Sequence, residues 1–186
     1  MSLRQIPNSL CILRMLLVVP VVLLLERGAY GATLVLFAIA AFTDALDGLL
    51  AKRFGWTSEL GKMLDPIADK LLMVASFITL AAIGRTPAWL AFVVVARDIV
   101  IATGAAVYRW LYGPIRGRPT PVSKLNTVCQ ILYVLAVVAA AATGLPPEWA
   151  VIALGALTFV TTVVSGTDYV IQYSRRAAAA SRAQRT

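Results

Sequence analysis

Six long apolar stretches occupy nearly the whole chain, separated by short segments rich in glycine, proline and charge. A helix needs about 20 apolar residues to cross roughly 30 Å of hydrocarbon, and each stretch is long enough to do so. The chain is 60% hydrophobic and 14% charged, a composition far from that of soluble domains. We therefore expect an all-α integral membrane protein, a bundle of six transmembrane helices near residues 9–26, 30–51, 63–84, 87–111, 122–144 and 148–173.

The basic residues predict the orientation of this bundle. With six spans, one side of the membrane would carry only Arg27 and Arg85, and the other side would carry most of the remaining lysines and arginines. Short cytoplasmic loops are enriched in these residues, so we expect both termini in the cytoplasm. Residues 1–173 would form the membrane domain, and residues 174–186 a basic polar tail. We expect a bacterial inner membrane, with the loop between the second and third spans and the loop between the fourth and fifth spans facing the cytoplasm.

The net charge of +8 bears on the partners of the chain. In a soluble protein this charge would suggest nucleic acid, but here the basic residues lie between and beside apolar stretches. Anionic lipid headgroups are therefore the expected partners, and no nucleic acid is expected.

Four aspartates lie in the segment DALDGLLAKRFGWTSELGKMLDPIAD, residues 44–69. Such a concentration of carboxylates is costly in an apolar protein. Helical spacing gathers them, with small residues, on one face of each of two helices. The first face carries Asp44, Asp47, Gly48 and Ala51, and the second carries Gly61, Asp65 and Asp69. The small residues leave room for a substrate, so the pattern predicts a pocket with two carboxylates on each side.

Facing carboxylates repel one another in a low dielectric unless cations compensate them. Oxygen ligands without histidine or cysteine select hard divalent ions, so we expect two cations, Mg²⁺, Mn²⁺ or Ca²⁺, able to clamp a phosphoryl group. Three alternatives stay open: ion pairs with neighbouring lysines and arginines, a cation transporter, or a purely structural bundle. Neither ion pairing nor transport explains why small residues share the faces of the aspartates.

The spacing of these residues resembles the signature of the CDP-alcohol phosphatidyltransferases, D-x2-D-G-x2-A-R-x8-G-x3-D-x3-D. Every position is filled except one, where Lys52 stands in place of arginine and is followed directly by Arg53. Lysine offers a point charge and not a planar fork, which changes how it can hold phosphate. The resemblance implies a membrane enzyme that binds CDP-diacylglycerol with its pyrophosphate on two Mg²⁺ or Mn²⁺ ions. An acceptor hydroxyl would attack the β-phosphorus and release CMP.

The resemblance also implies roles for single residues. Asp44, Asp47 and Asp65 would be metal ligands, and Asp69 would be both a metal ligand and the general base. Related enzymes are commonly homodimers, so we expect a homodimer here. The CDP-lipid would be bound by Pro7, Asn8, Asp47, Gly48, Ala51, Lys52, Arg53, Ser58 and Gly61.

The acceptor must be inferred from the second half of the chain. Residues 119–130, PTPVSKLNTVCQ, resemble the corresponding stretch of eukaryotic-type cardiolipin synthases, which join CDP-diacylglycerol to phosphatidylglycerol. Phosphatidylglycerophosphate synthases, which use glycerol 3-phosphate, tend to have Gly-Lys-x-Lys-Thr where residues 124–127 stand here. We therefore expect cardiolipin as the product, with phosphatidylglycerophosphate as the alternative.

Both acceptors present an anionic phosphate beside a glycerol hydroxyl, so basic residues in this region suit either. The positive-inside rule alone would also place basic residues in this loop. Charged groups within a span usually have partners and a function, which draws attention to Arg97 and Asp98. The expected acceptor site comprises Arg97, Asp98, Arg109, Arg116, Arg118, Lys124 and Asn126.

Overall fold

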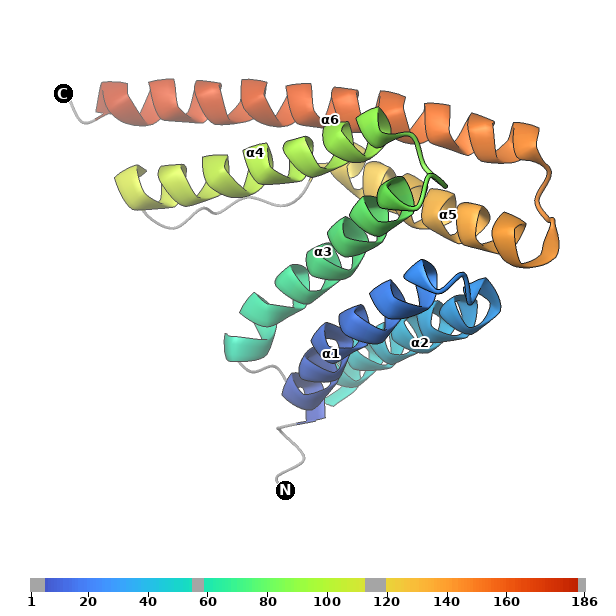
Figure 1. Ribbon diagram of the computed structural model, residues 1–186. Helices are drawn as coiled ribbons and strands as arrows, with labels where there is room; N and C mark the ends of the chain where they lie inside the picture. The colour runs from blue at the N-terminus through green and yellow to red at the C-terminus, as the bar shows by residue number, and fades with distance from the viewer. Residues whose placement is uncertain (1–5, 55–58, 113–119, 184–186) are drawn as a thin grey trace. The chain divides into compact units, whose positions relative to one another are not determined.

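The computed structural model describes residues 6–54, 59–112 and 120–183, with side chains described for 15–41, 43, 70–108, 110–111 and 120–174. Within these residues the chain forms six α-helices and no strand, as expected from the apolar pattern (Figure 1). The helices are α1 (Ile6–Glu26), α2 (Tyr30–Phe54), α3 (Glu59–Ala82), α4 (Ala88–Tyr112), α5 (Pro121–Thr143) and α6 (Glu148–Ala183).

Helix α6 differs from the expected span because it continues well beyond residue 173, to Ala183. Four consecutive alanines occupy positions 177–180. Alanine has the highest helix propensity, so this run favours a longer helix even though the segment is polar and basic. The tail expected from residue 174 is therefore mostly helical.

Three helices are long and apolar enough to cross a membrane within the described residues: Ala88–Tyr108, Pro121–Thr143 and Glu148–Ser174. Their mean hydropathies are 2.0, 2.0 and 1.8. The described apolar parts of the first three helices are shorter, namely Met15–Glu26, Tyr30–Ala41 and Lys70–Ala82. The membrane character expected from the sequence is thus supported by α4, α5 and α6, while six spans and cytoplasmic termini stay predictions.

The chain divides into two compact units. Unit 1 comprises Met1–Ala88 and Val134–Val151, and unit 2 comprises Trp89–Tyr133 and Ile152–Thr186. Helices α5 and α6 therefore contribute residues to both units.

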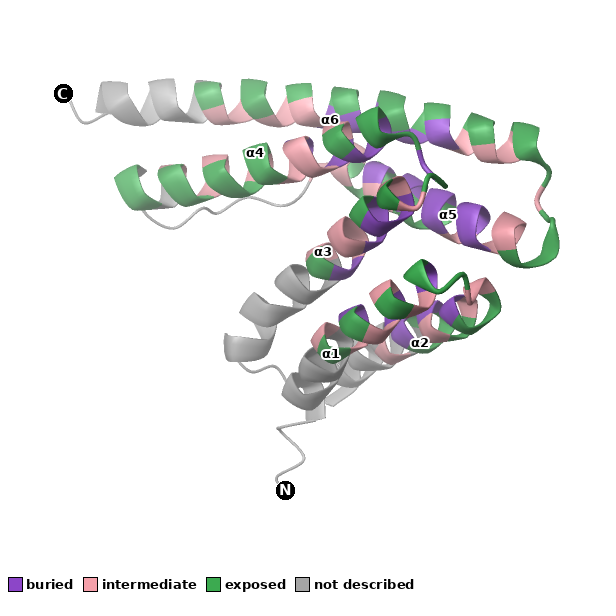
Figure 2. Cartoon of the chain, viewed as in Figure 1, coloured by how far each residue is buried: buried purple, intermediate pink, exposed green. Residues whose placement is uncertain are grey.

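In unit 1, helix α1 packs against both α2 and α3. Val18, Val21 and Leu25 are buried and share one face of α1, because their spacing is i, i+3 and i+7. Phe77 and Leu80 of α3 are fully buried in the same unit. Buried and exposed bands follow one another along the described part of α1 in Figure 2. This two-sided pattern is typical of a helix with one face in a protein core and the other toward apolar surroundings.

Helix α3 ends in a left-handed turn at Gly84, whose φ is +72°. The N–H of Gly84 donates to the carbonyl of Ala81, and the N–H of Arg85 donates to the carbonyl of Leu80 at 2.8 Å. This pair of bonds is the Schellman cap, in which a glycine adopts the positive φ without a Cβ clash. Gly28 ends α1 in the same way, so both helices stop sharply and reverse.

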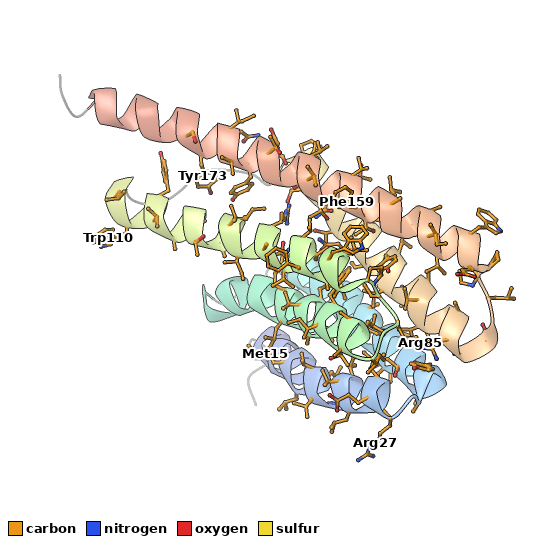
Figure 3. The ribbon with its side chains drawn as sticks, turned by 45° about the horizontal axis from the view of Figure 1, so that its top comes forward. Met15, Arg27, Arg85, Trp110, Phe159 and Tyr173 are labelled. Carbon is orange, nitrogen blue, oxygen red and sulfur yellow. The ribbon has the colours of Figure 1, made fainter. Side chains whose placement is uncertain are left out.

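Unit 2 buries polar residues beside apolar ones such as Leu90, Val94 and Tyr133, and exposes many large apolar side chains. Trp89 and Phe159 join α4 to α6 through an edge-to-face ring contact with centroids 5.4 Å apart (Figure 3). Large apolar side chains on the outside include Phe92 and Trp110, the latter labelled in Figure 3. Hydroxyl and amide groups that let helices approach and hydrogen-bond to one another are typical of membrane interiors. The buried polar residues of this unit are Arg97, Asn126, Gln130, Thr158, Thr161, Thr162 and Ser165.

Candidate functional site

The four aspartates of the predicted metal site lie on helices, as expected. Asp44 and Asp47 are in the C-terminal half of α2, and Asp65 and Asp69 are in the N-terminal half of α3. Both helices belong to unit 1 and pack against α1. The four side chains lie outside the described ones, so their role as metal ligands stays a prediction, and the described residues contain no group of three or more His, Cys, Asp or Glu that could hold a metal. A donor set made only of carboxylates on helical faces fits hard divalent cations.

The residues expected to bind the CDP-lipid fall at the same ends of these helices. Pro7 and Asn8 are in the first turn of α1, residues 48–53 form the end of α2, and Gly61 is near the start of α3. Their side chains, like the whole of Ser58, lie outside the described part of the structure. The helical backbone is therefore described at these positions, and the binding roles stay predictions.

Arg97 of α4 is buried at 7% exposure and joins the three helices of unit 2. Its Nη1 group donates to a carboxylate oxygen of Asp98 at 2.7 Å. Its Nη2 group donates to the hydroxyl of Ser123 on α5 at 2.8 Å and to the hydroxyl of Ser165 on α6. The prediction that these intramembrane charges have partners is confirmed. The two serines were not expected from the sequence.

Gly166, next to Ser165 on α6, leaves room for the side chain of Arg97. A Cβ atom built on Gly166 would lie 3.4 Å from Cγ of Arg97, which is tighter than most contacts between such atoms. The pair Ser165-Gly166 thus supplies an acceptor and a gap at adjacent positions of α6. This adjacent serine and glycine are a signal in the sequence that could have pointed to Ser165 as a partner of Arg97.

The start of α5 is fixed from two sides. Thr120 caps the helix, because its hydroxyl accepts the N–H of Ser123 at 3.2 Å, and Pro121 occupies the first helical position, where its missing N–H costs nothing. The hydroxyl of Ser123 in turn accepts a hydrogen bond from the guanidinium of Arg97. Lys124, the next residue, is exposed. Lys124 therefore lies at the capped start of α5, where an anionic phosphate can approach its exposed ammonium group.

Asn126 is fully buried and lies five residues after Pro121, about one and a half turns into α5. Its side-chain oxygen accepts hydrogen bonds from the hydroxyls of Thr161 at 3.0 Å and Thr162 at 2.9 Å, both on α6. Its Nδ2 group has no hydrogen-bond partner among the described residues. Gln130, one turn further on, is 1% exposed, and neither of its amide atoms has a partner there. The structure therefore places Asn126 in a helix–helix seam of unit 2.

The other predicted acceptor residues are not placed by their side chains. Arg109 is on α4, but its side chain is not described, and Arg116 and Arg118 lie outside the described residues. Of the seven predicted acceptor residues, the structure brings Arg97 and Asp98 together with the start of α5, close in sequence to Lys124 and Asn126.

An aromatic cluster in unit 2 connects α4 to α6. Tyr169 and Tyr173 of α6 stack with ring centroids 4.5 Å apart, and their hydroxyls are 2.9 Å apart. Tyr108 of α4 meets Tyr173 edge to face at 5.7 Å. Tyr173 is labelled in Figure 3. These rings hold the far ends of α4 and α6 together.

Comparison with known proteins agrees with the spacing of the aspartates. A family model described as CDP-alcohol phosphatidyltransferase matches residues 4–181. A probable phosphatidylglycerophosphate synthase of Mycobacterium tuberculosis is 34% identical over 92% of this chain and 82% of its own length. The human cardiolipin synthase (CMP-forming) is 29% identical over 92% of this chain and 62% of its own length. A Bacillus subtilis CDP-diacylglycerol–glycerol-3-phosphate 3-phosphatidyltransferase is 35% identical over 76% of this chain and 72% of its own length.

Proposed function

The chain belongs to the CDP-alcohol phosphatidyltransferase family, and we propose that it transfers the phosphatidyl group of CDP-diacylglycerol to phosphatidylglycerol, giving cardiolipin and CMP. The enzyme class follows from the family and from relatives that are themselves synthases and transferases. The observation that carries the proposal is the set of four aspartates at family spacing on α2 and α3, two helices that pack against α1. The cation-transport and purely structural alternatives find no counterpart among these relatives.

We propose that Asp44, Asp47, Asp65 and Asp69 hold two divalent cations, Mg²⁺ or Mn²⁺. When bound, such ions neutralise the pyrophosphate and make CMP a better leaving group. Asp69 accepts the proton of the acceptor hydroxyl as its oxygen attacks the β-phosphorus. The new P–O bond forms while the bond to the CMP oxygen breaks, and the electron pair leaves with CMP. Lys52 and Arg53 offset the charge of the nucleotide phosphates at the end of α2.

The acceptor side of the proposal rests on the start of α5. Lys124 is exposed there and is suited to contact the phosphate of the acceptor. The guanidinium of Arg97 is engaged with Asp98, Ser123 and Ser165, so its contribution is to hold Ser123, and with it Lys124, in place. We propose that Arg109, Arg116 and Arg118 add positive charge for the same phosphate.

Phosphatidylglycerol is favoured over glycerol 3-phosphate by the resemblance of residues 119–130 to the cardiolipin synthases. Asn126 stands where the alternative class tends to have a lysine, but it is buried and bonded to Thr161 and Thr162, so its neutral side chain shapes the seam between α5 and α6 and is not a direct contact of the acceptor. The second candidate, phosphatidylglycerophosphate synthesis, is favoured by the Mycobacterium tuberculosis relative at 34% identity. We also propose a homodimer in a bacterial inner membrane, with the active site toward the cytoplasm.

In the test, the purified full-length protein is incubated with CDP-diacylglycerol, Mg²⁺ or Mn²⁺, and either phosphatidylglycerol or glycerol 3-phosphate. The product lipid is identified by mass spectrometry. We expect CMP release that depends on the divalent ion, and cardiolipin formed faster than phosphatidylglycerophosphate. Incorporation of glycerol 3-phosphate with no cardiolipin would reverse the choice of acceptor. CMP formation that persists in the presence of excess chelator would overturn the metal mechanism.

A further inference from the structure

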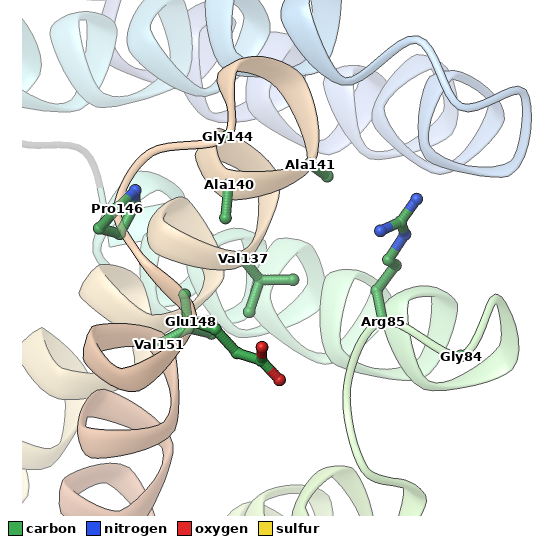
Figure 4. A pocket seen from close by; sticks show the side chains of 9 residues that line it. All are labelled: Gly84, Arg85, Val137, Ala140, Ala141, Gly144, Pro146, Glu148 and Val151. Carbon is green, nitrogen blue, oxygen red and sulfur yellow. The ribbon is translucent and has the colours of Figure 1, made fainter.

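A pocket lies in unit 1, away from the aspartates. It has a volume of about 380 Å³ and is formed by the end of α3, the end of α5 and the start of α6 (Figure 4). Helix α3 rises about 20 Å from Asp69 to its end at Ala82, at about 1.5 Å per residue, so this pocket and the proposed catalytic site are at opposite ends of α3. Its lining residues are Gly84, Arg85, Val137, Ala140, Ala141, Gly144, Pro146, Glu148 and Val151.

One cation and one anion line this pocket, Arg85 from the end of α3 and Glu148 from the start of α6 (Figure 4). The Nε group of Arg85 donates to the hydroxyl of Tyr30 at 3.2 Å, and the guanidinium lies 5.1 Å from the centre of that ring. These contacts leave the Nη groups available to a ligand. Among the described residues, neither Arg85 nor Glu148 is in an ion pair, although both line the same space.

The position of Arg85 is set by the backbone before any ligand binds. Gly84 has a φ of +72°, and the N–H of Arg85 is bonded to the carbonyl of Leu80 in the cap of α3. Tyr30 then holds the side chain from the start of α2. A cation fixed in this way loses little conformational freedom when it binds a phosphate.

The level of the pocket is that of a membrane interface. Tyr30 begins α2, and Trp149, the residue after Glu148, is 72% exposed. Tyrosine and tryptophan gather where the hydrocarbon meets the headgroups. Between the two charges the lining is apolar and small, with Val137, Ala140 and Ala141. A ligand for this pocket therefore needs an anion, a cation and a short apolar portion at headgroup depth.

We propose that this pocket binds the headgroup of a zwitterionic phospholipid with a primary ammonium group. The phosphate accepts hydrogen bonds from the Nη groups of Arg85, whose planar fork matches phosphate oxygens. The ammonium donates to the carboxylate of Glu148. The glycerol and the first methylenes lie against Val137, Ala140 and Ala141. The site is separate from the proposed catalytic function and does not depend on it.

The test uses the full-length protein in nanodiscs of equal parts phosphatidylethanolamine and phosphatidylglycerol, with retained lipid counted by native mass spectrometry. We expect retention of phosphatidylethanolamine over phosphatidylglycerol, and a loss of about tenfold in Arg85→Gln and in Glu148→Gln. Arg27→Gln and Glu26→Gln make the same charge changes at exposed neighbours outside the pocket and should retain the lipid as wild type does. A circular dichroism spectrum equal to that of the wild type reports that each variant is folded.

Three outcomes would overturn the proposal. Equal retention by wild type, Arg85→Gln and Glu148→Gln would mean that the pocket does not bind the lipid. A loss in Arg85→Gln with none in Glu148→Gln would indicate a site for phosphate alone. Displacement of the lipid by equimolar soluble phosphoethanolamine would indicate a site for the free headgroup. If Arg85→Gln does not fold, Arg85→Lys replaces it and should lose part of the retention, because the charge remains and the fork does not.

Discussion

Replacing Arg97 by methionine should lower the free energy of unfolding by about 3–5 kcal/mol. The side chain is 7% exposed, and its guanidinium donates to Asp98, Ser123 and Ser165. Each hydrogen bond to a charged group contributes about 1.5–3 kcal/mol. The serine hydroxyls can turn to backbone carbonyls of their own helices, so the loss is smaller than the sum. Its main part is the loss of the buried ion pair between the guanidinium and the carboxylate of Asp98, 2.7 Å apart.

The double variant Arg97→Met with Asp98→Leu separates this charge effect from the loss of packing. Removing both charges should bring the cost to about 1 kcal/mol, since a buried pair replaced by apolar residues is often nearly neutral. Unfolding of the full chain in micelles by increasing sodium dodecyl sulfate, followed by tryptophan fluorescence, measures both values. Lys124→Met, which removes an exposed cation of the same unit, is the matched control and should cost less than about 0.5 kcal/mol. A double variant as unstable as Arg97→Met would refute the reasoning.

Five other substitutions have defined outcomes. Gly84→Ala should lower stability by about 1–2 kcal/mol in the same assay, because alanine is strained at a φ of +72°. Gln130→Leu should leave stability unchanged or raise it by up to about 1 kcal/mol, since neither amide atom has a described partner. Asn126→Leu, by contrast, should cost about 1–2 kcal/mol, because it removes the acceptor of two threonine hydroxyls. Asp69→Asn should lower kcat at least about 100-fold, as measured by steady-state kinetics, and should weaken equilibrium binding of CDP-diacylglycerol much less. A loss of binding with an unchanged kcat would contradict the role of general base. Lys52→Arg restores the residue typical of the family and should change CMP release less than about threefold; a large loss would mean that lysine is specifically accommodated.

Hydropathy was sufficient to predict six helices and most of their bounds, because long apolar stretches in this chain have few other ways to satisfy their backbone hydrogen bonds. It did not predict the end of α6 at Ala183, where helix propensity and not apolarity extends the helix. Nor did it indicate that α5 and α6 are shared between two units.

For the candidate site, the helical backbone at the aspartates of residues 44–69 could be predicted, because their spacing repeats along one segment of the chain. The partners of Arg97 were not predictable, since Ser165 is distant in sequence and serine is common on membrane helices. Asn126 was expected to face the acceptor, and only the tertiary packing shows its oxygen bonded to Thr161 and Thr162.

Thr161 has a second set of bonds that affects how the seam between α5 and α6 can open. Its hydroxyl lies 3.0 Å from the oxygen of Asn126 and also 2.9 Å from the carbonyl of Leu157 and 3.1 Å from that of Thr158, on its own helix. If the helices separate here, the hydroxyl of Thr161 keeps an acceptor on its own helix. The hydroxyls of Thr162 and Thr158 donate across the seam, to Asn126 and to the carbonyl of Cys129, and lose these bonds when it opens. The cost of opening the seam therefore falls on Thr158, Thr162 and Asn126, and Thr161 can exchange its acceptor at little cost.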